Sequence, residues 1–161
     1  MQAQVAMFVL VTAAAQVAAP AETRFESRRP GEVAVPVTIG SRGPFRFQID
    51  TGSSHTAITP GLAQALAARP IARAPVSASG GTVECLIVAL EPLAVGPVAV
   101  DDLTATVLPA GAADRLGGVD GILGQDFLGR FSFTIDYARS RIRWHAAGAA
   151  ATAGEPAGIL L

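Results

Sequence analysis

The sequence of 161 residues contains no lysine, and all twelve of its basic side chains are arginine. We attribute this, together with the abundance of alanine, to genome composition rather than to function. Acidic and basic residues nearly balance at a formal net charge of −1, and neither sign clusters strongly. Since a nucleic-acid-binding surface needs a concentrated basic patch, no nucleic-acid partner is expected.

Cysteine and histidine are almost absent as well. The single cysteine, Cys85, rules out an internal disulfide, and its apolar neighbours are typical of a core or strand thiol. The two histidines, His55 and His145, provide no spacing typical of a metal site, so we expect neither a metal nor a cofactor. The glycine-rich stretch at 117–121 is not followed by the lysine of a phosphate-binding loop.

Aromatic residues make up only 6% of the chain, whereas half of all residues are apolar. The core must therefore consist mainly of Val, Ile, Leu and Ala, and the length suits one domain. Many short runs of alternating apolar and polar residues, separated by turn residues, indicate strands. Because only two short helical patterns occur, we expect a mostly-β barrel or sandwich.

The first residues look like a targeting segment. Residues 5–19 are apolar and rich in alanine, which is typical of a signal-peptide core, and small residues suitable for cleavage follow at Ala19 and Ala21. The segment lacks the usual basic head. We therefore expect 1–21 to be a signal peptide or an N-terminal anchor. The protein is then exported, periplasmic or extracellular, or it is anchored in the membrane with residues 5–19 as the tether.

The remaining boundaries follow from composition. Residues 22–31 are polar and are expected to be a linker, or else a loose first strand. The domain itself is placed at 32–146. Residues 147–161 lie in a stretch rich in alanine and glycine that is typical of a flexible tail.

Two alternating runs near the start of the domain predict a hairpin. Residues 32–39 place four apolar side chains on one face, and residues 45–49 alternate in the same way. This hairpin delivers Asp50 to the end of a strand. After a third short strand at 56–59, Pro60 opens a predicted helix that extends to Ala68, with Thr59 as its N-cap.

The second half predicts a further hairpin whose tip is Ser79-Gly80-Gly81. A tip of serine and glycine suits a flap over a cleft, although a plain surface hairpin fits the same pattern. We expect another strand at 103–108, a loop over 109–118, and a closing hairpin formed by residues 131–137 and 141–144.

Asp50 begins the stretch Asp50-Thr51-Gly52-Ser53, in which small and hydroxylated residues follow a strand. Gly52 has no Cβ, so the backbone can approach the carboxylate closely. Thr51 could brace the loop against a second copy of the chain, and Ser53 could donate to the carboxylate of Asp50. Two such carboxylates at hydrogen-bond distance share a proton and can act as acid and base. When the tripeptide is taken alone, an ordinary turn is the better explanation.

The wider context resembles the retropepsin-like aspartic proteases, in particular the single-lobe bacterial kind. Three features carry the resemblance: the apolar strand that leads into Asp50-Thr51-Gly52, the glycine-tipped hairpin, and the segment Gly121-Ile122-Leu123-Gly124-Gln125-Asp126. The resemblance covers most of the domain. It implies one lobe of a closed, mostly-β acid-protease barrel with one or two short helices.

The resemblance also implies roles for individual residues. Asp50, Thr51 and Gly52 would be catalytic, supported by Ser53 and by the segment Ile122, Leu123 and Gly124. Ser79, Gly80 and Gly81 would form the flap that binds a peptide or protein substrate. Asp126 would start a helix and be structural. Since the chain has a single Asp-Thr-Gly, a homodimer is implied, in which each subunit supplies one Asp50.

Two alternatives remain open on the sequence. One is a non-catalytic envelope protein that binds a peptide on the same barrel, and the other is a secreted β-domain with a coincidental Asp-Thr-Gly. A serine hydrolase is disfavoured, because no nucleophile-elbow pattern surrounds Ser53. Asp120 is interpreted as a turn residue.

Overall fold

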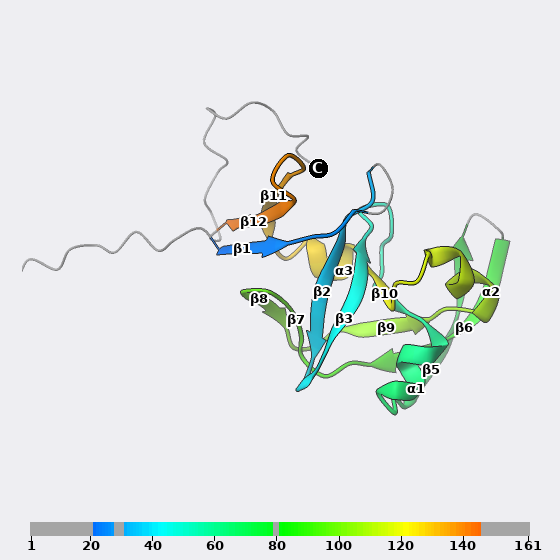
Figure 1. Ribbon diagram of the computed structural model, residues 1–161. Coiled ribbons are helices and arrows are strands. Elements are labelled where there is room, and N and C mark those ends of the chain that lie inside the picture. Colours follow the sequence, from blue (N-terminus) through cyan, green and yellow to red (C-terminus); the bar gives the residue numbers. More distant parts are fainter. Residues whose placement is uncertain (1–20, 28–30, 79–80, 146–161) are drawn as a thin grey trace, which may run out of the picture.

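The computed structural model describes residues 21–27, 31–78 and 81–145, and its strands form two sheets (Figure 1). The larger sheet has the strand order β5-β6-β9-β4-β10-β3-β2-β7-β8, and the smaller one has the order β1-β12-β11. The strands are β1 (Ala21–Arg24), β2 (Ala34–Ile39), β3 (Arg42–Ile49), β4 (Ala57–Ile58), β5 (Pro70–Ala78), β6 (Gly81–Ala89), β7 (Leu93–Val95), β8 (Val98–Val100), β9 (Thr104–Val107), β10 (Gly121–Leu123), β11 (Ser132–Asp136) and β12 (Arg141–His145). The prediction of a mostly-β chain is confirmed. The hydrogen-bonded order of the larger sheet runs from β5 to β8 in the described residues, so closure of the barrel stays a prediction.

Four short helical segments complete the fold: α1 (Pro60–Ala65), α2 (Ala110–Ala113), the 3₁₀ turn η1 (Asp114–Leu116) and α3 (Gln125–Leu128). Thr59 caps α1 as predicted, since its hydroxyl accepts a hydrogen bond from the backbone N–H of Leu62. The prediction of a plain loop over residues 109–118 is wrong, because α2 and η1 lie within it. Neither places a fully buried residue in the core, which explains the weak sequence signal.

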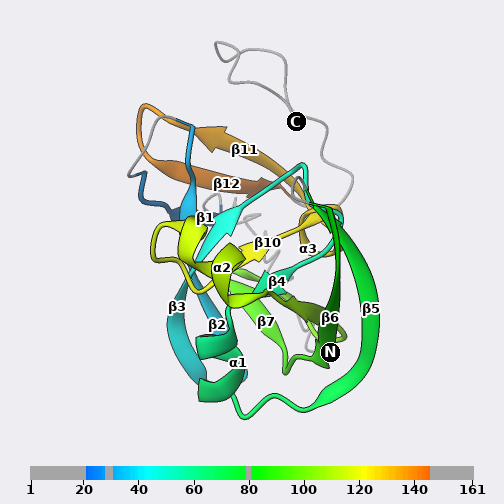
Figure 2. The same cartoon turned by 90° about the vertical axis from the view of Figure 1, so that its right-hand side faces the viewer.

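The centre of the larger sheet determines where the candidate site lies. β3 and β4 come before and after residues 50–56, but they do not pair with each other. β10 lies between them, parallel to β3 and antiparallel to β4. A segment about seventy positions further along the chain therefore lies between the two strands that hold the loop, as Figure 2 shows.

The core is built from aliphatic side chains, as the composition predicts. The alternation of β2 buries Val35, Val37 and Ile39 and leaves Pro36 exposed. Phe47 of β3 and Phe127 of α3 are both fully buried. Burial of side chains of this size is worth roughly 1.5–3 kcal/mol each. The aromatic residues thus add to a Val, Ile and Leu core around the strands that carry the site.

The smaller sheet joins the two ends of the described chain. β1 pairs antiparallel with β12, so that Ala21 lies opposite Trp144. The indole N–H of Trp144 donates to the hydroxyl of Thr23 over 2.9 Å, and both residues are buried. Of the two alternatives for residues 22–31, a linker is therefore wrong for the first part, which forms a strand.

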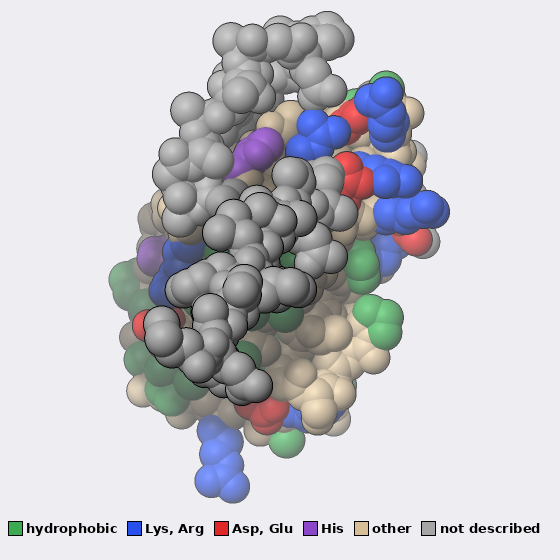
Figure 3. All heavy atoms as spheres, turned by 90° about the vertical axis from the view of Figure 1, so that its left-hand side faces the viewer, with side chains coloured by type: hydrophobic (Ala, Val, Ile, Leu, Met, Phe, Trp, Pro, Cys, Tyr) green, Lys and Arg blue, Asp and Glu red, His purple; other side chains and the backbone are tan. Residues whose placement is uncertain are grey.

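Charges on this sheet lie in mixed pairs. Glu22 forms ion pairs with Arg141 and Arg143 of the neighbouring strand, and Asp136 pairs with Arg139. In the upper right part of the face shown in Figure 3, arginine side chains lie beside acidic ones. This arrangement agrees with the balanced composition.

Several predictions fall on residues that the structure does not describe. The signal peptide or anchor, with its tether at 5–19, lies outside the described residues, as do the tail at 147–161 and the hairpin tip residues Ser79 and Gly80. In the part of the chain that is described, no helix has the length and apolar character to span a membrane.

Candidate active site

β3 carries Asp50 to its position at the end of the sheet. The backbone N–H of Ile49 donates to Val33 on one side, and that of Asp50 donates to Leu123 over 3.1 Å on the other. The strand is therefore hydrogen-bonded up to the residue that bears the carboxylate. Because the pairing with β10 is parallel, Leu123 and Ile49 end side by side.

The carboxylate of Asp50 is held by its own loop. The N–H of Gly52 donates to Oδ1 of Asp50 over 2.9 Å, and the N–H of Ser53 donates to the Asp50 carbonyl over 3.2 Å. A Cβ on Gly52 would lie 3.3 Å from the same Oδ1, which is tighter than most contacts of real side chains. Asp50 and Thr51 are half-buried and Gly52 is exposed, so the turn faces outward from a single chain.

Ser53 does not contact the carboxylate. Its hydroxyl donates to the carbonyl of His55 over 2.8 Å, so the prediction that it orients Asp50 is wrong. The serine instead closes the second half of the loop upon itself. The physical reason is local, since the carbonyl two residues further on lies within reach of the same hydroxyl.

Thr56 and Asp126 fasten the far end of the loop. Both carboxylate oxygens of Asp126 lie 2.9 Å from the N–H of Thr56, and the Thr56 hydroxyl donates to Oδ1 over 2.8 Å. Thr56 is fully buried, and its hydroxyl also accepts from the N–H of Gly124 over 3.3 Å. Asp126 lies in the first turn of α3, where a carboxylate is favourable, and it does more than start a helix. It binds the segment that follows the Asp50 turn.

Glycine is required where the second segment passes the loop. A Cβ on Gly124 would lie 2.4 Å from the carbonyl carbon of His55, and one on Gly121 would lie 2.5 Å from both the Ala57 carbonyl oxygen and the Phe47 ring. Contacts this short do not occur for real side chains. The segment of Ile122, Leu123 and Gly124 therefore lies directly against the loop, with Leu123 fully buried and Ile122 half-buried.

Gln125 is a residue that sequence reasoning missed. Its backbone N–H donates to the Ser53 carbonyl over 2.9 Å, and its side-chain Nε2 donates to the Thr51 carbonyl over 2.9 Å. Thr56 was missed as well. A single polar residue next to a motif gives no periodic signal, so neither contact could be found without the fold.

Asp120 has a structural role at the other end of β10. Its carboxylate accepts from the N–H of Arg46 over 2.8 Å, and its own N–H donates to the Arg46 carbonyl over 2.7 Å. It thereby extends the pairing of β10 with β3. Asp120, which the sequence presents as a turn residue, thus also continues the strand pairing.

The predicted flap is a hairpin of β5 and β6, which pair from Pro70 opposite Val88 to Ala78 opposite Gly81. Figure 1 shows it at one end of the larger sheet. Among its described residues, 70–77 and 81–84 contain no buried side chain, and the first buried one is Cys85. Ser79 and Gly80 are not described, so the position of the tip relative to Asp50 stays a prediction.

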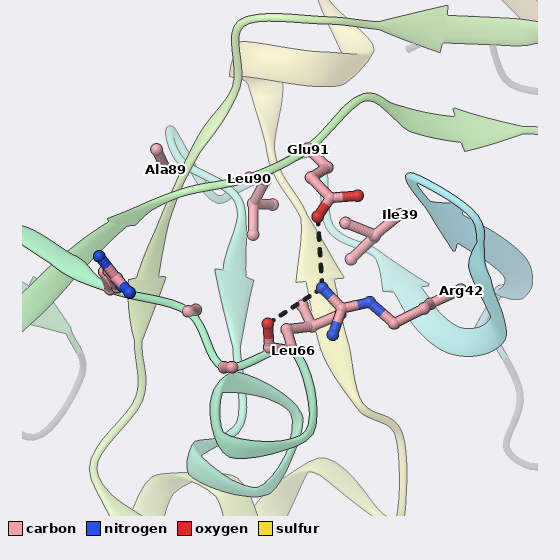
Figure 4. Close-up of a pocket in the computed structure, with 9 residues that line it drawn as sticks. Ile39, Arg42, Leu66, Ala89, Leu90 and Glu91 are labelled. Carbon is pink, nitrogen blue, oxygen red and sulfur yellow. Dashed lines mark hydrogen bonds and ion pairs between the residues drawn. The ribbon is translucent and has the colours of Figure 1, made fainter.

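A pocket of about 140 Å³ lies elsewhere, at the carboxyl end of α1 (Figure 4). Arg42 crosses it and donates to the carbonyls of Ala65 and Leu66 over 3.1 and 3.0 Å, and it forms an ion pair with Glu91 at 3.4 Å. Its guanidinium thus satisfies helix carbonyls that have no partner within the helix. Residues of the Asp50 loop and of the segment 121–126 do not line this pocket.

Known proteins resemble the chain in sequence family and in fold. The family model described as aspartyl protease matches residues 35–127, which is more than half of the chain. No curated protein matches the chain. Among solved structures, a retropepsin-like aspartic protease from Rickettsia conorii is 18% identical with a TM-score of 0.54, covering 76% of this chain and 89% of that one. The retroviral protease-like domain of Ddi1 from Leishmania major is 15% identical with a TM-score of 0.45, covering 78% and 97%. The first likeness shows a retropepsin-like fold.

Proposed function

Because the chain belongs to the aspartyl protease family, with a retropepsin-like fold, we propose that it is an aspartic endopeptidase that acts as a homodimer. The observation that carries the proposal is the hydrogen bond from the Gly52 N–H to Oδ1 of Asp50. It orients a carboxylate at the outward-facing end of a strand, and the rest of the loop is fastened to β10 and α3.

The chemistry requires two carboxylates. When two Asp50 side chains approach to hydrogen-bond distance they share one proton, because both cannot ionise so close together. The ionised one takes a proton from a water molecule, whose oxygen attacks the peptide carbonyl carbon. The protonated one donates to the carbonyl oxygen. Cleavage of the C–N bond then releases an amine, which takes up a proton, and a carboxylic acid.

The second carboxylate has to come from another copy of the chain. The sequence contains one Asp-Thr-Gly. The outward-facing turn, with Gly52 exposed and Thr51 half-buried, leaves room for a symmetry-related loop across a two-fold axis. The hairpin of β5 and β6, whose tip is Ser79-Gly80-Gly81, would close over a peptide bound between the two subunits.

The same proposal includes the location of the protein. Residues 5–19 would direct export to the periplasm or the extracellular space, or would hold the domain on the membrane as a tether. The alternative activity is peptide binding in the envelope without cleavage.

The direct test is Asp50→Asn in the full chain, with Asp102→Asn as a control because Asp102 is an exposed partner of Arg130. Because each subunit supplies one Asp50, the substitution removes both catalytic carboxylates, and we expect cleavage of a denatured protein to fall by at least about 10²–10⁴-fold. The melting temperature and the dimer mass should be unchanged, and the control should cleave normally. A statine-containing peptide should inhibit the wild type. Equal cleavage by wild type and Asp50→Asn contradicts the proposal, and binding of a peptide without cleavage by the wild type supports the alternative.

A further inference from the structure

We propose that Gln125 is a positioning residue for Asp50 and that it acts through the peptide group between Thr51 and Gly52. This inference rests on the proposed function, since it assigns a residue that prepares the carboxylate for catalysis. It goes beyond the Asp-Thr-Gly motif, because Gln125 lies about seventy residues further along the sequence.

One peptide group joins the two side chains. Its N–H, from Gly52, donates to Oδ1 of Asp50 over 2.9 Å, and its carbonyl, from Thr51, accepts from Nε2 of Gln125 over 2.9 Å. A donor on the carbonyl oxygen draws electron density toward that oxygen and strengthens the N–H as a donor. The hydrogen bond from Gln125 therefore strengthens the hydrogen bond to the Asp50 carboxylate through the one peptide group that the two bonds share.

The side chain is well placed to hold this peptide plane. The backbone of Gln125 is fixed, because its N–H donates to Ser53 and its carbonyl accepts from Gly129 over 2.9 Å each. The following residue, Asp126, is bound to Thr56. Gln125 thus extends from an anchored helix start back across the loop to the turn that bears Asp50.

The amide is the feature that matters. The Thr51 carbonyl accepts a hydrogen bond from the side-chain amide of Gln125, and an aliphatic side chain offers no such donor. A glutamate of the same length would place an ionised acceptor against the carbonyl oxygen. Gln125 is exposed in the single chain, so substitution there leaves no cavity in the core.

The test compares Gln125→Met with Arg115→Met in the full-length protein. Arg115 is a matched control, because its side chain also donates to a backbone carbonyl, that of Gly111 over 3.0 Å, at an exposed position outside the site. The readouts are the NMR resonance and hydrogen exchange of the Gly52 amide, together with kcat and KM for peptide cleavage. The amide measurements need no catalytic activity.

We expect Gln125→Met to move the Gly52 amide proton upfield and to speed its exchange several-fold. It should lower kcat by about fivefold to tenfold, the scale of one hydrogen bond, with KM changed by less than about twofold. Gln125→Glu should lower kcat further. Arg115→Met should change none of these quantities.

The outcomes separate the two proposals. If the wild type cleaves peptides but Gln125→Met matches Arg115→Met in the Gly52 resonance and in kcat, the positioning role is overturned and the proposed function stands. If the wild type cleaves no peptide while the Gly52 amide responds only to the Gln125 substitutions, the structural link to Asp50 is supported and the proposed function fails.

Discussion

The Asp50 loop and the hairpin of β5 and β6 both belong to the larger sheet, but they differ in how the rest of the domain contacts them. Residues 50–56 are short, but hydrogen bonds from β10 and α3 reach the loop at its start, middle and end. The hairpin is long, and residues 70–77 and 81–84 bury no side chain. Local stability follows buried contacts and protected hydrogen bonds. The molecule thus combines a fixed position for a reactive group with an arm that depends mainly on its own strand pairing.

The largest loss of stability at the Asp50 loop is expected from Gly124→Ala. The added Cβ would meet the backbone of His55 at 2.4 Å, so β10 and the loop must move apart. Overpacking of this kind costs about 3 kcal/mol. Unfolding in denaturant should show the loss, together with loss of cleavage. Gly111→Ala is the control, because its Cβ would have open space, and it should leave stability equal or slightly higher.

A somewhat smaller effect is expected from Asp126→Asn. The change keeps the shape of the side chain but removes its negative charge. The carboxylate of Asp126 accepts hydrogen bonds from the N–H and the hydroxyl of the buried Thr56. We expect a loss of about 2 kcal/mol in the free energy of unfolding, as for hydrogen bonds to a charged group. The exposed ion pair of Asp102 with Arg130 provides the comparison, since Asp102→Asn should cost less than about 0.5 kcal/mol. If both variants lose the same free energy of unfolding, the hydrogen bonds between Asp126 and Thr56 stabilise the domain no more than an exposed ion pair does.

Hydrogen exchange tests the contrast itself without a mutation. The amides of Val76 and Val83 lie in the outer half of the hairpin, whereas those of Thr56 and Gly124 are bound at the loop. We expect the hairpin amides to exchange through local opening and the loop amides only when the whole domain unfolds. In low denaturant the first group should therefore exchange at a rate that is insensitive to denaturant. If all four amides are protected from exchange to a similar degree, the hairpin is as stable as the loop and the proposed difference between them is wrong.

The smallest effect lies outside both regions, at Glu22 of β1. The hydrogen bond from Arg141, followed by the charges of Arg141 and Arg143, holds the pKa of Glu22 below its usual value. A carboxylate with a lowered pKa stabilises the folded protein above the pKa of the unfolded chain, and this contribution is lost as the pH falls through the folded pKa. Glu22→Gln should therefore lower the melting temperature slightly at pH 7 and not at all in strong acid. Gly124→Ala, which changes no charge, should differ from wild type at either pH.

The sequence predicts those elements near the loop and in the hairpin that depend on local pattern. Alternation at 32–39 and 45–49 predicts the hairpin that ends at Asp50, and the structure confirms it. Thr59 and Pro60 likewise predict the start of α1. The glycine-tipped run predicts the pairing of β5 with β6.

The individual hydrogen bonds that fasten the loop could not be predicted from local pattern, because they join distant segments through single residues. β10 is three residues long, and nothing local indicates that it inserts between β3 and β4. The hydroxyl of Ser53 donates to the carbonyl of His55, and the sequence alone does not distinguish this acceptor from the carboxylate of Asp50. Residues 110–113 consist only of alanine and glycine, so α2 has no apolar face to reveal it.

The pairing of Ala21 with Trp144 has a consequence for how the domain can be rearranged. Since β1 and β12 are antiparallel neighbours, residue 145 ends beside the residue where β1 begins. A short turn could join the two and turn them into an ordinary hairpin. New ends could then be opened in an exposed connection such as the turn of residues 137–140, and the order of the strands in space would be preserved. The domain is thus suited to circular permutation.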